Sequence, residues 1–268
     1  MRTIRAADTD KLRLDVEGAL ARLVIDNAPR RNALDMGMWR AIPELARAAD
    51  ADPEIRVVIV CPAPGLPFCS GADISEFSTV RATAEGGRAY EAANAAAFDA
   101  LAACGKPVVA AISGFCLGGG MGLAAACDLR VASADAQFGI PAGRLGVGYP
   151  PASMAYVVAA VGAAAARDLF FTARRFGAAD AKALGFLDRL TNTHSALQEA
   201  ETLAVEIAAN APLTLRAAKA AIARVARLPA APDAAACDRL AAACFDSADY
   251  AEGRAAFLEK RKPDFRGV

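Results

Sequence analysis

The segment from Pro107 to Asp128 constrains the fold of this chain most, because a short apolar run there leads into a glycine-rich turn. Residues 108–112 read Val-Val-Ala-Ala-Ile, which predicts a buried strand, and residues 118–122 read Gly-Gly-Gly-Met-Gly at the start of an Ala-rich stretch that predicts a helix. Glycines at a helix start let another group approach bare backbone N–H groups, where the helix dipole favours negative charge.

A second turn of this kind lies upstream. Residues 68–74 read Phe-Cys-Ser-Gly-Ala-Asp-Ile, a loop that leads into another polar-started segment. Two turns that each offer backbone donors suggest an oxyanion hole, in which two N–H groups converge about 3 Å from an oxygen that gains negative charge. An alternative interpretation of residues 118–122 is that their glycines only allow close packing of a helix on a strand.

The rest of the chain alternates between strand and helix patterns. Residues 12–16 and 19–25 alternate around a Glu-Gly turn, which indicates a β-hairpin, and Asp35 can cap a helix that runs toward Asp50. Further strands are predicted at residues 56–60, 108–112, 129–132 and 186–190. Because the later strands follow helical stretches, the pattern favours α/β crossover units over a β-sandwich.

Length and composition fit one soluble unit. The chain has 268 residues, of which 55% are hydrophobic and 22% charged. From His194 onward the pattern is helical, so we expect residues 1–193 to form the core with the ligand site and residues 194–268 to form a helical region of the same structural unit. The longest apolar stretch, residues 154–166, is too short and glycine-interrupted to span a bilayer, so we expect no membrane partner.

Charge and cysteine usage narrow the functional classes. Thirty basic and 30 acidic residues cancel, so no bulk field favours nucleic acid, and an anion must be met by a local cluster. Seven cysteines without a CxxC pair indicate reduced thiols in the cytoplasm, and one histidine offers no metal partner. Cys69 and Cys116 lie beside the two turns, where a buried-core role is favoured over a nucleophilic one.

Five motifs in order along nearly the whole chain resemble one known family. They are residues 27–34 (Asn-Ala-Pro-Arg-Arg-Asn-Ala-Leu), 68–77, 114–128, 136–141 (Ala-Gln-Phe-Gly-Ile-Pro) and 257–263 (Phe-Leu-Glu-Lys-Arg-Lys-Pro). In this order they resemble the crotonase, or enoyl-CoA hydratase/isomerase, superfamily. The resemblance implies the crotonase (ClpP-like) fold, an α/β fold of repeated ββα units with a helical C-terminal trimerisation region.

The resemblance also implies a ligand and a site. The ligand is an acyl-CoA thioester, with coenzyme A as part of the substrate and no other cofactor, and the backbone N–H groups of Ala72 and Gly119 form the oxyanion hole. The implied CoA-binding positions, besides these two, are Arg30, Arg31, Ala33, Asp73, Ile74, Ser75, Phe257 and Lys260. In the family the C-terminal segment encloses the CoA of a neighbouring subunit, so a homotrimer or a dimer of trimers is expected.

The chain departs from the family's hydratases at two positions. There, two glutamates hold and activate water, whereas this chain has Gly122 and Ala142, which carry no proton-transfer group. Candidates to replace them are Glu76, Arg144 and Tyr149, which lie near the first turn or in the segment that normally carries the second glutamate. Isomerisation, decarboxylation, hydrolysis and an unusual hydration all stay open, as does a non-catalytic acyl-CoA-binding role.

For several other residues we expect a structural role or no specific function. Residues 120–125 fit a weak dinucleotide fingerprint, but no acidic residue follows at the required spacing. We expect His194 to begin a helix, Asp128 to bond to backbone, and Asp73 to cap a helix beside the first turn. Ala-rich helices without net charge argue against RNA binding.

Overall fold

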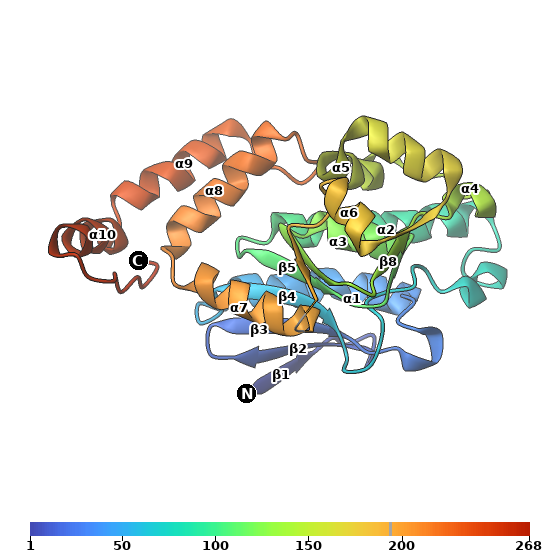
Figure 1. Cartoon of the computed structure of the whole chain (residues 1–268), viewed down its shortest axis with the longest axis horizontal. Coiled ribbons are helices and arrows are strands. Elements are labelled where there is room, and N and C mark those ends of the chain that lie inside the picture. Colours follow the sequence, from blue (N-terminus) through green and yellow to red (C-terminus); the bar gives the residue numbers. More distant parts are fainter. Residues whose placement is uncertain (193–194) are drawn as a thin grey trace.

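The computed structural model describes residues 1–192 and 195–268 and shows the expected α/β architecture. A seven-stranded sheet has the order β1-β2-β3-β4-β5-β7-β10, and a three-stranded sheet has the order β6-β8-β9 (Figure 1). The strands are β1 Arg2–Arg5, β2 Leu12–Glu17, β3 Leu20–Ile25, β4 Val57–Pro62, β5 Val108–Ile112, β6 Phe115–Leu117, β7 Leu129–Ser133, β8 Gln137–Gly139, β9 Arg175–Gly177 and β10 Arg189–Thr191.

Helices cover the sheets and extend from them (Figure 1). They are α1 Met36–Ala51, α2 Ala84–Ala103, α3 Gly119–Ala126, α4 Ala142–Leu145, α5 Pro151–Thr172, α6 Ala178–Ala183, α7 Ala196–Ala208, α8 Pro212–Val225, α9 Ala234–Phe245 and α10 Ala248–Glu259, with short 3₁₀ helices η1 Ala28–Arg30 and η2 Ile74–Ser78.

The predicted N-terminal elements are confirmed. Strands β2 and β3 pair antiparallel as a hairpin, and β3, β4, β5, β7 and β10 then run parallel. Asp35 caps α1 by accepting a hydrogen bond from the Met38 N–H over 2.8 Å. Parallel neighbours require crossover connections, which explains why the sequence alternates between strand and helix patterns.

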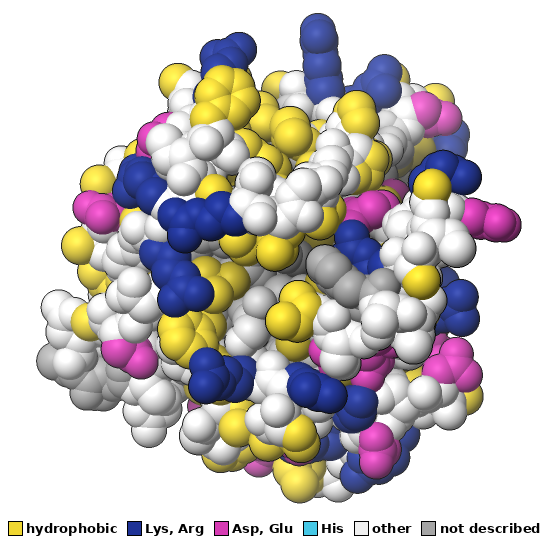
Figure 2. Space-filling view, turned by 90° about the vertical axis from the view of Figure 1, so that its right-hand side faces the viewer, with side chains coloured by type: hydrophobic (Ala, Val, Ile, Leu, Met, Phe, Trp, Pro, Cys, Tyr) yellow, Lys and Arg dark blue, Asp and Glu magenta, His cyan; other side chains and the backbone are white. Residues whose placement is uncertain are grey.

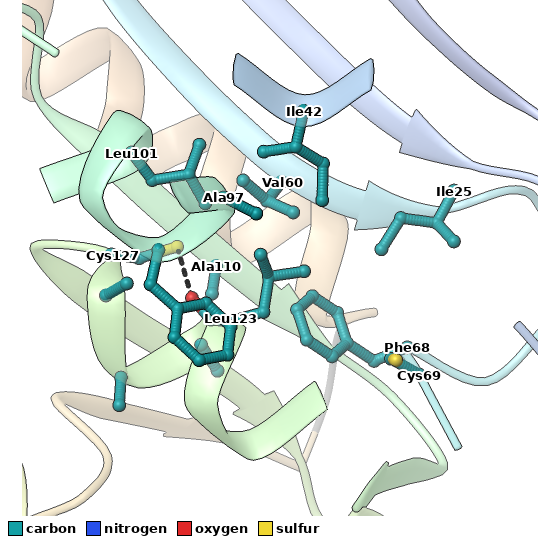
Figure 3. Packing of buried hydrophobic residues seen from close by; sticks show 14 of the residues in the cluster. Ile25, Ile42, Val60, Phe68, Cys69, Ala97, Leu101, Ala110, Leu123 and Cys127 are labelled. Carbon is teal, nitrogen blue, oxygen red and sulfur yellow. Dashed lines mark hydrogen bonds between the residues drawn. The ribbon is translucent and has the colours of Figure 1, made fainter. Parts of the chain in front are cut away.

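The large sheet is buried on both faces, and β4 shows how one strand serves both. Val58 and Val60 belong to the main core, which includes residues of α1, α2 and α3 (Figure 3). Val57, Ile59 and Cys61 face the opposite core, where α7 contributes Ala200, Leu203 and Ala204. This follows from the two-residue period of a strand, and it explains why β4 reads as a continuous apolar run.

One predicted strand is misplaced. The expected strand at residues 186–190 begins only at Arg189, because the Phe186 N–H still donates to the Ala181 carbonyl and closes the end of α6. The Phe186 side chain is fully buried against Phe138, with ring centroids 5.6 Å apart. Its apolar character therefore reflects core packing and not strand pairing.

The C-terminal region is helical, as expected. Helices α8, α9 and α10 extend from the sheets toward one end of the molecule, whereas α4 lies at the other end (Figure 1). The expectation for His194 and the predicted division after residue 193 fall on residues outside those described. Ser195 caps α7 with a reciprocal capping box that includes Gln198.

Helix α5 is the one described helix that is long and apolar enough, by length and composition, to cross a membrane. Its helical path is interrupted at Gly162, where φ is 77° and ψ is 162°. The helix packs against α2, α3 and α4 and buries Tyr156 and Leu169. Core helices of water-soluble proteins share these properties of length and composition.

Asp128 and the cysteines have the structural roles expected of them. The Asp128 carboxylate accepts a hydrogen bond from the Val108 N–H over 2.7 Å and pairs with Lys219 over 2.8 Å. All seven cysteines are free, and five of them are buried. Burial raises the pKa of the Cys69 thiol to about 12, and Cys116 shifts in the same direction, so these two thiols are protonated core groups.

Candidate active site

The two glycine turns meet backbone to backbone. Gly71 has a φ of 102°, and a Cβ built on it would lie 3.0 Å from the Leu117 carbonyl oxygen and 3.7 Å from the Gly119 nitrogen. A side chain at residue 71 would therefore separate the turns and would also strain the backbone. The sequence thus needs glycine here for both conformation and approach.

The first turn leaves one N–H free of the neighbouring strand segment. Ala72 forms an isolated parallel bridge with Leu34, in which the Leu34 N–H donates to the Gly71 carbonyl over 2.8 Å and the Asp73 N–H donates to the Leu34 carbonyl over 2.9 Å. In a parallel bridge of this kind, the N–H of the central residue points to the opposite side. The Ala72 N–H is therefore directed away from Leu34.

The second turn places Gly119 at the first position of α3. Gly118, with a φ of 52°, precedes the helix and donates its N–H to the Gly139 carbonyl over 2.8 Å. An N–H at the first position of a helix has no acceptor within the helix, and the helix dipole adds partial positive charge there. The interpretation that these glycines allow close packing is also supported, because a Cβ on Gly120 would lie 2.7 Å from the Cys69 Cβ.

Both turns border a cavity of about 190 Å³, called here the inner cavity. A second, wider cavity of about 730 Å³, the outer cavity, adjoins it. Arg81, Glu91, Val147 and Tyr149 line both. Figure 2 shows the face at the end of the molecule where α4 lies, which is hollowed and has Lys and Arg side chains around the hollow. The local positive charge that an anionic ligand needs is therefore present despite the zero net charge.

Two buried polar atoms in the inner cavity point to a ligand or ordered water. Within the described part of the chain, Asn94 Oδ1 and Ser153 Oγ have no hydrogen-bond partner. Both residues line the inner cavity, and Asn94 Oδ1 lies 3.6 Å from the place of a Cβ on Gly119. Buried polar atoms are rarely left unpaired, so something polar is expected to occupy this space.

Gly122 and Ala142, the two positions that the resemblance assigns to the hydratase glutamates, have different surroundings. Ala142 lines the inner cavity. Gly122 is buried, and a Cβ on it would lie 2.6 Å from Phe98 Cζ. The Phe98 ring thus fills the space that a side chain at residue 122 would need. Gly122 has no positive φ, so this steric contact is what bars a glutamate there.

The structure brings one of the three candidate proton-transfer residues to the site. Tyr149 lines both cavities and packs edge-on against Phe170, with centroids 5.2 Å apart. Burial raises its pKa, which keeps the phenol protonated. Glu76 instead accepts a hydrogen bond from the Met36 N–H over 3.0 Å, and Arg144 is exposed on α4. Neither belongs to the described lining of the two cavities.

The predicted CoA-binding residues fall into two groups. Around the first turn, Ser70 donates to the Arg31 carbonyl over 2.7 Å, and Arg30 lies 3.5 Å from Asp73, which caps η2 as expected. The other members of this group are Ala33, Ile74 and Ser75. Phe257 and Lys260 lie on or just after α10, at the far end of the molecule from α4 (Figure 1). Within one chain these two groups are far apart.

Five polar cavity residues were not predicted from the sequence. They are Arg81, Glu91, Asn94, Ser153 and Arg175. A signal for two of them exists in α2, because Glu91 and Asn94 fall seven and four residues before the buried Phe98 on one face of an Ala-rich helix. Arg81, Ser153 and Arg175 come from separate segments and meet only through the fold.

A mostly parallel seven-stranded sheet, a small second sheet and a cavity bordered by two glycine turns are the features expected of the crotonase fold. The family model described as enoyl-CoA hydratase/isomerase matches residues 15–268. The chain belongs to this enzyme family.

Relatives and solved structures agree. A probable enoyl-CoA hydratase of Mycobacterium leprae is 33% identical over 96% of this chain and 98% of its own. A peroxisomal Delta(3,5)-Delta(2,4)-dienoyl-CoA isomerase of Arabidopsis thaliana is 31% identical over 95% of each chain. A solved structure of an enoyl-CoA hydratase/isomerase family protein from Hyphomonas neptunium is 41% identical, with a TM-score of 0.89 over 97% of this chain and 98% of its own. These names include both hydration and isomerisation.

Proposed function

We propose that this chain binds an acyl-CoA thioester in the inner cavity and stabilises its enolate with the N–H groups of Ala72 and Gly119. The observation that carries the proposal is the backbone approach of Gly71 to Gly119, with both turns bordering one cavity. Donors fixed in a water-poor site stabilise a developing oxyanion strongly, and loss of one such donor typically costs about 3–4 kcal/mol of barrier.

The exposed end of the inner cavity suits the CoA moiety. Ile74 and Leu145 line it and are 68% and 51% exposed, so they offer apolar surface at the opening. Arg30 and Arg31 lie beside the first turn and supply positive charge for phosphate groups. CoA enters as part of the substrate, and enolate stabilisation by backbone donors needs no further cofactor.

Assembly and location are part of the same proposal. Exposed apolar side chains on the C-terminal helices, including Ile222, Phe245 and Phe257, favour a homotrimer or dimer of trimers in which α10 reaches the CoA of a neighbour. Free, buried cysteines favour a cytoplasmic setting.

The proposal is tested by incubating the protein with enoyl-, malonyl-type and aromatic CoA thioesters. Binding is followed by calorimetry against free CoA, and products by mass spectrometry. Product mass separates water addition, CO₂ loss and hydrolysis, and chromatography detects isomerisation, which leaves mass unchanged. Absence of thioester binding contradicts the proposal. Binding without any product supports the second candidate function, a non-catalytic acyl-CoA-binding protein, which the loss of both hydratase glutamates favours.

A further inference from the structure

One face of α2 is directed at the site. Glu91, Asn94 and Phe98 all line the inner cavity, at a spacing that places them on the same side of the helix. Phe98 contacts the space above Gly122, and Asn94 lies beside Gly119. Glu91 is one helical turn further along and lies where the inner and outer cavities meet.

Glu91 supplies the one carboxylate among the described residues that line these two cavities. Its side chain is 18% exposed and pairs with Arg81 over 3.0 Å. The Arg81 guanidinium lies 4.5 Å from the centre of the Tyr90 ring, which holds it in place. The carboxylate is therefore both oriented and largely shielded from water.

The surroundings of Glu91 suit a base. Burial raises its pKa, and the charge of Arg81 opposes this only in part. A carboxylate with a raised pKa accepts a proton from carbon more readily than an exposed one does. Tyr149, the neighbouring titratable group, stays protonated and so offers a donor and not a base.

We propose that Glu91 is the catalytic base of this site and that it moves one proton along a β,γ-unsaturated acyl thioester. This inference rests on the proposed acyl-CoA function. Glu91 takes a proton from C2, the C–H electron pair forms the C1–C2 double bond of a dienolate, and the carbonyl pair moves onto oxygen. The dienolate then collapses, the carbonyl reforms, and the same proton returns at C4. The double bond moves from C3–C4 to C2–C3, with no change in composition or oxidation state.

A single carboxylate favours this reaction over hydration. A 1,3-proton shift needs one group that accepts a proton and returns it, and Glu91 can do both. Addition of water needs one group to activate water and another to protonate carbon, and the position of Gly122 cannot carry a second carboxylate while Phe98 fills the space.

The test uses but-3-enoyl-CoA with the full-length protein and its Glu91→Gln and Glu91→Asp variants. Glu85→Gln is the matched control, because Glu85 is an exposed carboxylate on the same helix. We expect the parent and the control to form the conjugated 2-enoyl thioester, and Glu91→Gln to lose about 10²–10⁴-fold in kcat with unchanged thioester affinity. Glu91→Asp should retain part of the activity. The pH profile of the parent should show kcat rising as one acid ionises, and this limb should be absent in Glu91→Gln.

The outcomes distinguish a failure of the Glu91 proposal from a failure of the proposed acyl-CoA function. Failure of the parent to bind the thioester contradicts the proposed function itself. Binding without isomerisation in the parent, or the parent's kcat and pH profile in Glu91→Gln, overturns the role of Glu91 and leaves thioester binding intact. A purely structural ion pair with Arg81 would change the unfolding midpoint of Glu91→Gln but not remove the acidic limb of the profile.

Discussion

Phe98 and Gly122 share one volume: the ring of Phe98 lies 2.6 Å from where a Cβ on Gly122 would be. A glutamate cannot be placed at residue 122 while Phe98 keeps its position. The Phe98 ring therefore accounts for the absence of a side chain at residue 122, the position that the resemblance assigns to the first hydratase glutamate.

This link predicts a non-additive pair of substitutions. Gly122→Ala should lower the free energy of unfolding by about 1–3 kcal/mol, because it overpacks the contact with Phe98. Phe98→Leu should reduce the cost of Gly122→Ala, and a denaturant-based double-mutant cycle measures the coupling. Gly87→Ala is the control, because nothing lies within 4 Å of a Cβ there. Strict additivity of the two substitutions would contradict the shared volume.

A comparison of Gly119→Pro with Gly119→Ala measures the contribution of the Gly119 N–H to turnover. Both add a Cβ that would lie 3.0 Å from Trp39 Cζ2, so both share this steric contact, but only proline closes a ring onto the nitrogen and deletes the donor. Proline also suits the first position of a helix. We expect turnover to fall about 10²–10³-fold further in Gly119→Pro than in Gly119→Ala. Equal rates in the two folded variants would remove Gly119 from the oxyanion hole.

Ordinary hydration of crotonyl-CoA should be very slow in the parent protein. The resemblance assigns the two hydratase glutamates to Gly122 and Ala142, and a site that lacks both does not position water, each missing group being worth about 10²–10⁴ in rate. Ala142→Glu returns a carboxylate to the inner cavity, whereas Gly122→Glu is blocked by Phe98. We therefore expect the single Ala142→Glu variant to hydrate faster than the Gly122→Glu variant. A parent turnover on the order of 10 s⁻¹ would contradict the interpretation of both positions.

Lys260→Ala should weaken CoA binding only if subunits associate. Lys260 follows α10, far from the cavities of its own chain (Figure 1), so it can reach a CoA phosphate only in a neighbour. Calorimetry should show a loss of affinity comparable to that of the parent in high salt, since salt screens the same contact. Light scattering gives the oligomeric state, and a stable monomer with normal CoA affinity would contradict the role.

Stability should fall in alkaline solution. Burial raises the pKa of Cys61, Cys69 and Cys127 to about 12, whereas in the unfolded chain these thiols titrate near their ordinary value of 9.0. Their stabilisation is complete below the unfolded pKa and is lost as pH rises from about 9 toward about 12, because only the unfolded state then releases protons. The denaturant midpoint should drop between pH 8 and 10, and less so in Cys127→Ala. A Cys127→Ala slope equal to the parent's would count against this account.

The sequence predicted those parts of the molecule that local patterns determine. The hairpin of β2 and β3, the Asp35 cap and the start of α3 all follow from residue spacing and capping chemistry. The strand predicted at residues 186–190 began too early, because an apolar residue such as Phe186 fits a strand pattern in the sequence although its side chain is buried in the core.

For the site, the two turns could be predicted but most cavity side chains could not. Glycine conformation fixes the turns locally, whereas Arg81, Ser153 and Arg175 converge only after the segment before α2, helix α5 and strand β9 have packed. Glu76 and Arg144 are close to the turns in sequence, yet the fold directs them elsewhere. Proximity along the chain was therefore a poor guide to proximity at the cavity.

The bare start of α3 has a consequence for anyone who wishes to redesign this protein. Trp39, Cys69 and Phe98 press on Gly119, Gly120 and Gly122, so that side of the pocket accepts no new functional group. Other lining positions, such as Glu91 and Asn94 on α2 and Tyr149, carry replaceable side chains. New catalytic side chains would therefore have to be introduced on α2, while the glycines at the start of α3 are kept unchanged as the source of backbone N–H donors.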